Sequence, residues 1–202
     1  MSKFYNKWIM IKFFKNRIEA AKEIKIYIFI LSALFVASFL QGYAAAAQNQ
    51  KEAEEILRQL FSEFEFIGEL SSLEIFLFIF LNNSLKALLA IILGFFFGLV
   101  PLFFVLFNGQ IIGIVVYVAG LETGAAAVIL SLMPHGIFEI PVFIISSGYG
   151  LWLGVKFYRK LFHKEPFRIY FQKAIGEFFK ILLPLFLLAA FIEVFLTAHL
   201  AG

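Results

Sequence analysis

Leu132–Ser146 reads LMPHGIFEIPVFIIS, which places His135 and Glu139 inside an otherwise apolar run. A run this hydrophobic is typical of a membrane span, where ionisable residues are costly and rare. The rest of the chain has the same character, since 62% of its 202 residues are hydrophobic and 15% are charged. Soluble domains are usually about 25% charged. The sequence therefore predicts an all-α, polytopic helical membrane protein.

The apolar blocks divide into five membrane spans of about 20 residues or more. No stretch between them is long enough for a soluble domain, so residues 1–202 are expected to form a single membrane domain. The fourth span is interrupted by prolines and is expected to be broken. The predicted spans are 24–47, 73–99, 101–120, 125–155 and 174–199.

Charge is segregated along the chain and predicts its orientation. Residues 1–25 hold seven Lys and Arg against two Glu, and residues 156–173 hold six against one. Residues 48–74 hold seven Glu against Lys51 and Arg58. Because basic connections stay in the cytoplasm, five spans with the N-terminus inside and the C-terminus outside satisfy these biases. We expect a multi-pass protein of the cell (plasma) membrane.

Two amphipathic helices are expected beside the spans. Residues 1–23 alternate aromatic and basic positions, which indicates a helix lying on the cytoplasmic leaflet rather than a nucleic-acid-binding arm. Residues 48–72 place apolar residues on one face and glutamates on the others, which indicates an external helix. That acidic face is either simply solvated or attracts cations.

Glycine pairs at four-residue spacing allow close approach of helices. They either pack helices within the bundle or form a face for a homo-oligomer. The pairs are Gly94 with Gly98, Gly109 with Gly113, and Gly150 with Gly154.

Polar residues from several spans fall at similar depth. Glu139 lies near the centre of its span, and His135 lies four residues earlier, roughly 6 Å closer to the outside. Residues at this depth are expected to meet, because a buried charge needs partners. The remaining members of this predicted cluster are Asn82, Asn83, Lys86, Asn108 and Glu193.

The backbone around Glu139 carries three unusual residues. Pro134 suits the first turn of a helix, Gly136 allows close approach, and Pro141 removes the hydrogen bond to the Ile137 carbonyl. We expect this span to be broken and to line a cavity, where irregular backbone is tolerated at membrane depth.

Three interpretations of the cluster stay open. It is a hydrogen-bonded network that locks the spans together, a pathway for a small ion or solute, or a divalent metal site. The metal site would use His135 and Glu139 with Glu74 or Glu193. The chain has no cysteine, no aspartate and no HExxH motif, and nothing in it indicates an enzyme.

The segment PHGIFEIP, at 134–141, resembles the signature of the stage II sporulation protein M family. Supporting matches are Glu74, Asn82-Asn83, Gly94, Gly98 and the run NGQIIG at 108–113. The resemblance implies an integral membrane domain of five or six helices. In endospore formers the namesake anchors a complex with a peptidoglycan-degrading partner.

These observations favour a channel or transporter for a small ion or solute. Glu139 is the expected charge centre, and His135 its gate or co-ligand. The first alternative is a non-catalytic membrane scaffold that recruits partner proteins. The second is an intramembrane metal-binding site.

Overall fold

A computed structural model describes the backbone of residues 2–62 and 65–197. It describes side chains from Ala20 to Phe195, except those of residues 63–65, 134 and 135. The described residues are almost entirely helical and contain no strand. Five helical segments are long and apolar enough to cross a membrane, as predicted. They are Ala20–Gln48, Ser72–Phe95, Leu99–Thr123, Gly136–His163 and Phe167–Phe195.

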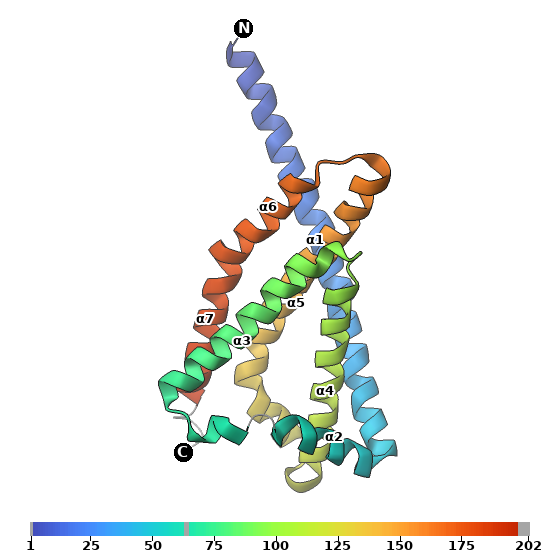
Figure 1. Cartoon of the computed structure of the whole chain (residues 1–202), viewed down its shortest axis with the longest axis vertical. Coiled ribbons are helices and arrows are strands. Elements are labelled where there is room, and N and C mark those ends of the chain that lie inside the picture. The colour runs from blue at the N-terminus through green and yellow to red at the C-terminus, as the bar shows by residue number, and fades with distance from the viewer. Residues whose placement is uncertain (1, 63–64, 198–202) are drawn as a thin grey trace.

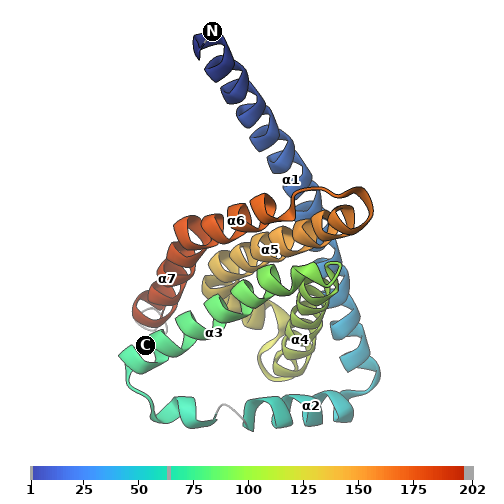
Figure 2. The ribbon, with the colours of Figure 1, turned by 45° about the horizontal axis from the view of Figure 1, so that its top comes forward.

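The chain runs back and forth between two ends, which the predicted orientation makes the inner and the outer end (Figures 1 and 2). The start of α1 (Ser2–Gln48) and the connection between α5 and α6 lie at the inner end. The acidic helix α2 (Gln50–Ser62) and the 3-10 turn η1 (Glu65–Glu69) lie at the outer end. The two ends thus separate the basic from the acidic segments.

The prediction of a separate basic helix over residues 1–23 is wrong. The structure has one unbroken helix, α1, whose first part projects beyond the bundle instead of lying across its end (Figure 1). The sequence explains this, because neither glycine nor proline occurs before Gly42 to end a helix. Side chains before Ala20 are outside the described residues, so the amphipathic face there stays a prediction.

A separate helix after the first span is confirmed but is shorter than residues 48–72, and its external side stays a prediction. Ala53 and Leu57 of α2 are buried against Ala46 and Ile114, which belong to α1 and to α4 (Leu99–Thr123). Phe61, one turn after Leu57 near the end of the helix, is exposed. One apolar face of α2 is therefore used to close the outer end of the α1–α4 pair.

Helix α3 (Ser72–Ile92) and helix α4 form a hairpin that opens toward the outer end (Figure 1). They are joined by η2 (Leu93–Phe95) and a turn in which Phe97 and Gly98 have positive φ. This turn packs on α5 (Ala125–His163). Along the rest of the hairpin, α4 packs chiefly on α1, while α3 packs on α5 and α7 (Leu183–Phe191).

The predicted break in the fourth span is not present. Helix α5 is continuous from Ala125 to His163 and passes through both Pro134 and Pro141. A proline removes one hydrogen bond and bends a helix without necessarily ending it, and α5 is bowed in Figure 1. The helix also extends past residue 155 to a left-handed C-cap at Lys164.

The last span begins at Phe167, seven residues earlier than predicted. It consists of α6 (Phe167–Glu177), a π-helical turn (Phe178–Leu182), α7 and a second π-helical turn (Ile192–Thr197). The first wide turn directly precedes Pro184, which has no N–H to donate to the Lys180 carbonyl.

The glycine pairs all pack against backbone within the chain. A Cβ on Gly150 would collide with the Ala90 carbonyl, and one on Gly154 would collide with Gly94 and Gly98. Gly109 and Gly113 pack in the same way on the backbone of α1. Packing within the bundle therefore accounts for these spacings, and they provide no argument for a dimer face.

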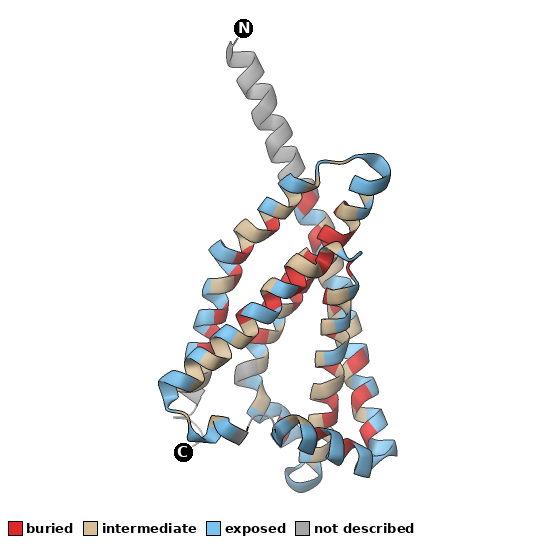
Figure 3. Cartoon of the chain, in the orientation of Figure 1, coloured by how far each residue is buried: buried red, intermediate tan, exposed pale blue. Residues whose placement is uncertain are grey.

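Figure 3 shows where burial is concentrated in the fold. The largest cluster of buried residues joins α1, α3, α5 and the last span and includes Trp152, Phe178 and Phe186. Outward-facing positions on the spans are largely apolar and exposed, as expected for contact with lipid.

Candidate functional site

A cavity of about 60 Å3 lies between α3, α4 and α5 at the middle of the spans. Asn83 marks its depth, since it is the midpoint of the Ser72–Phe95 span. Four of its lining residues are polar and come from three helices: Asn83, Lys86, Asn108 and Glu139. Its apolar wall is formed by Phe35, Ile112, Ile140, Phe143 and Phe186. The structure thus brings together four of the predicted cluster residues.

Glu139 is the most deeply buried of these polar groups, with 5% of its surface exposed. The side-chain amide of Asn83 donates a hydrogen bond to Glu139 Oε2. This bond joins α3 to α5 across 56 residues of sequence. A carboxylate at this depth is expensive unless it is bonded or neutralised, so Asn83 contributes directly to tolerating it.

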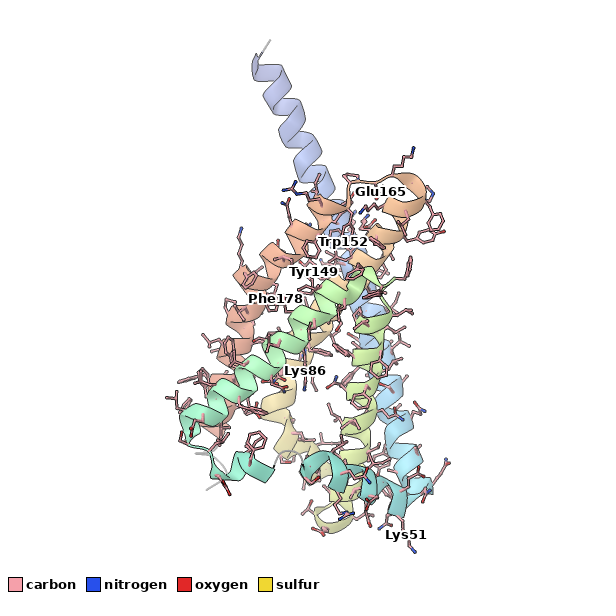
Figure 4. The ribbon with its side chains drawn as sticks, in the orientation of Figure 1. Lys51, Lys86, Tyr149, Trp152, Glu165 and Phe178 are labelled. Atoms are coloured by element: carbon pink, nitrogen blue, oxygen red, sulfur yellow. The ribbon has the colours of Figure 1, made fainter. Side chains whose placement is uncertain are left out.

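Lys86 and Asn108 complete the polar lining. Lys86 lies about one turn from Asn83 toward the inner end and lines the cavity, and Figure 4 labels it beside α3. The Glu139 carboxylate acts electrostatically on its ammonium group. Asn108 donates from Nδ2 to the Phe104 carbonyl at 2.7 Å, so this amide is anchored to its own helix while lining the cavity.

Three predicted residues are not among those that line the cavity. Asn82 is half-buried on a neighbouring face of α3. Glu193 is half-buried in the last π-helical turn, toward the outer end. Glu74 forms a capping box with Ser71 at the start of α3. The side chain of His135 lies outside the described residues.

The three-ligand metal set containing Glu74 and Glu139 is not assembled. Nine residues of α3 separate Glu74 from Asn83, which is roughly 13 Å along the helix axis. Asn83 contacts Glu139, so Glu74 and Glu139 lie too far apart for one metal ion, whose oxygen ligands sit about 2–2.6 Å away. Among the described residues no group of three His, Cys, Asp or Glu is placed to hold a metal.

A second charge cluster, built at the inner end around the buried Lys156, was not predicted. Glu23 of α1 accepts hydrogen bonds from Trp152 Nε1 at 2.7 Å and from the Lys156 ammonium. Arg159 lies 3.5 Å from the same carboxylate. The Lys156 ammonium also lies 4.8 Å from the centre of the Tyr170 ring. These contacts tie α1, α5 and α6 together.

The sequence offered only part of the signal for this second cluster. Trp152 and Lys156 are four residues apart and share a face of α5, which is readable from spacing. Their partner Glu23 is 129 residues from Trp152 in sequence. Glu23 also lies among basic residues in sequence, so it was interpreted as an ordinary charged residue of a surface helix.

Comparison with known proteins identifies the family. The family model of stage II sporulation protein M matches residues 28–198, which include most of the first span and all of the other four. The chain is 32% identical over 126 residues to the uncharacterized protein MJ0793 of Methanocaldococcus jannaschii, covering 60% of this chain and 70% of the relative. No solved structure matched the chain. The chain belongs to the stage II sporulation protein M family.

Proposed function

We propose that this protein is a non-enzymatic channel or transporter of the cell membrane that carries a small ion through a site centred on Glu139. The observation that supports the proposal is the cavity at mid-span depth, lined by Glu139, Asn83, Lys86 and Asn108. Polar groups at this depth are rare and usually line ion or proton pathways. One chain supplies all four residues, so the proposal needs no second copy.

The size of the cavity restricts what it could carry. Its volume of about 60 Å3 is enough for a few water molecules. A proton or a small monatomic ion with its waters suits this size better than a large solute. Lys86 disfavours a permanently bound metal cation beside Glu139, because its ammonium would repel that cation. The proton is therefore the first candidate.

We expect access from the outer side. Toward the inner end, Gly150 and Gly154 bring α5 into backbone contact with α3 and the following turn, so these two elements leave no gap between them there. Toward the outer end, α3 and α4 diverge, and the acidic helix α2 lies across that end (Figure 1). His135 lies one turn outward from Glu139 on α5 and is the proposed gate.

The test is ion flux into liposomes that contain the purified protein. With imposed proton, Na+ or K+ gradients, the proposal expects flux above that of empty liposomes. Glu139→Gln should reduce it by about tenfold or more, because the amide cannot carry the exchangeable charge. The matched control is Glu122→Gln, which changes an exposed glutamate at the outer end of α4 and should leave flux unchanged.

A lack of ion flux would contradict the proposal. If the wild type shows no flux under any gradient, the conduit is excluded and the polar cluster serves to lock the spans. In that case Glu139→Gln should still change the thermal midpoint in detergent, because the Asn83 contact remains part of the α3–α5 interface.

A scaffold role has one observation in its favour. The first part of α1 projects beyond the inner end of the bundle, where it is available to a cytoplasmic partner (Figure 1). This function expects that deletion of residues 2–19 abolishes partner capture while Glu139→Gln preserves it. Equal capture with and without residues 2–19 would contradict it.

A further inference from the structure

We propose that the turn between α3 and α4 is inserted among the acyl chains of the inner leaflet instead of being exposed to the cytoplasm. The inference is independent of Glu139 and of the proposed ion pathway. It begins from the sequence of the turn, which reads LGFFFGLVP at 93–101. No polar or charged side chain occurs between Lys86 and Asn108. Turns in water are rich in Asn, Asp and Ser beside Gly and Pro, so this composition indicates an apolar environment.

The backbone of Phe97 adopts a conformation that a bulky side chain disfavours. Its φ is 53°, in the left-handed region, and Gly98 follows with a φ of 76°. Glycine or asparagine is usual at such a position, and a large residue there is an outlier. Phe97 is also half-exposed, so contacts within the chain cover only part of its ring. Acyl chains around the exposed part would explain why an aromatic residue stands there.

The exposed side chains of the turn continue the lipid-facing surface of the spans. Phe96, Phe97 and Leu99 are 50%, 52% and 63% exposed. Leu89 of α3 and Phe103 of α4, on the mid-span side of the turn, are exposed as well. Because no polar side chain separates these positions from the turn, the acyl chains that cover the two helices are the expected cover of the turn.

The backbone of the turn is suited to this environment. Phe96 and Leu99 each donate from N–H to the carbonyl three residues earlier, at 3.1 and 3.0 Å, and Gly98 donates to the carbonyl four residues earlier at 2.8 Å. Gly154 of α5 packs directly on the turn, since a Cβ there would collide with the backbone of Phe97 and Gly98. Irregular backbone at membrane depth is tolerated where protein covers it, and α5 supplies that cover.

The turn also stops short of the inner end of the bundle. The Phe95 and Phe97 rings pack on Phe157 of α5, with centroids 5.9 and 6.1 Å apart. Helix α5 continues from there to His163, which is about 9 Å farther along its axis. Figures 1 and 2 show the α5–α6 connection beyond the turn. Lys160, whose ammonium lies 5.5 Å from the Phe157 ring centre, can reach the headgroups from this level. The turn thus lies at the depth of the acyl chains.

The test measures the surroundings of a spin label attached to the turn. The chain has no cysteine, so Phe96→Cys and Leu99→Cys each carry a single nitroxide in liposomes. Collision rates are measured with O2, which dissolves among acyl chains, and with a neutral, water-soluble nickel chelate. The two references are Phe103→Cys, on the lipid-facing side of α4, and His163→Cys, at the exposed end of α5.

The turn should behave like the lipid-facing reference. The ratio of O2 to nickel collisions at both turn positions should match that of Phe103→Cys. It should exceed the ratio at His163→Cys by about tenfold, because a polar chelate is excluded from hydrocarbon. Thermal midpoints in detergent confirm that each labelled variant is folded.

A pair of substitutions at Phe97 tests why an aromatic residue stands there. Phe97→Asn fits the left-handed backbone but favours water, so it should raise nickel collisions at Leu99→Cys toward the value of His163→Cys. Phe97→Leu keeps an apolar side chain at the same position and should leave those collisions unchanged. Equal nickel collisions in the two variants would show that the side chain does not hold the turn among the acyl chains.

Two further outcomes would overturn the inference. A ratio at Phe96→Cys equal to that at His163→Cys would place the turn in the cytoplasm. Low collision rates with both reagents would show that protein, not lipid, covers the turn. Dipolar broadening between labels would then identify that protein as a second copy of this chain.

Discussion

Glu23 and Glu139 are both glutamates inside the helical bundle, but their surroundings differ. Glu23, at the inner end, is bonded to Trp152 and Lys156 and lies close to Arg159. Its partners Trp152 and Lys156 are almost completely buried, at 0% and 5% exposed. This network is densely packed among aromatic rings and does not line the mid-span cavity.

Glu139, at mid-span, accepts a bond from one amide and faces a cavity that it shares with Lys86. A glutamate thus lies in a tightly packed interface at the inner end and beside a cavity at mid-span. The comparison shows that a buried charge by itself does not indicate a pathway. What distinguishes the two sites is the packing around the charge, which also predicts different responses to mutation.

The largest expected effect comes from the glycine contacts that close the inner half. Gly154→Leu should destabilise the protein by about 3 kcal/mol or more, because its side chain meets the backbone of Gly94 and Gly98 rather than movable side chains. The thermal midpoint in detergent should fall by roughly 10 °C. Gly176→Leu, which meets nothing within 4 Å, is the matched control and should be tolerated. Equal midpoints for the two variants would show that the inner half is not tightly closed.

A smaller effect is expected at the inner network. Glu23→Gln should cost about 2 kcal/mol, because it leaves the buried Lys156 ammonium without its counter-charge. Adding Lys156→Met should recover much of that stability. Ion flux per folded molecule should remain at the wild-type level, whereas Glu139→Gln should reduce flux per folded molecule. A loss of flux in Glu23→Gln at unchanged stability would reverse the roles assigned to the two sites.

The features predicted from sequence are those that local pattern determines. Hydropathy identified five spans, and an apolar face flanked by glutamates identified helix α2. Depth along each span correctly grouped Asn83, Lys86, Asn108 and Glu139, because residues at one level in adjacent helices can meet. Glu74, which was named as a third metal ligand and not from its depth, is not part of this group, because it sits at the outer end of α3, where its carboxylate bonds to Ser71.

The remaining features depend on contacts between distant segments. Spacing showed that Pro134 and Pro141 perturb the span, but whether α5 breaks or bends depends on the helices packed around it. The projection of α1 follows from the absence of a glycine or proline before Gly42. The aromatic and basic pattern of residues 1–23 had instead indicated a separate helix on the membrane surface. The pairing of Glu23 with Trp152 has no local signature, because it joins two helices far apart in sequence.

The most direct test of the central claim asks whether water and ions reach the cavity from the outer side. The chain has no cysteine, so Asn108→Cys introduces a single reactive thiol at the cavity wall. Ag+ added to the outer side of sealed vesicles should block this thiol from later labelling with a fluorescent maleimide after denaturation. Ag+ added to the inner side should not block it. Ser147→Cys, at a fully buried position of α5, is the control and should stay unblocked from either side. If the Asn108→Cys thiol remains unblocked from the outer side, the cavity is sealed and Glu139 does not lie on an ion pathway.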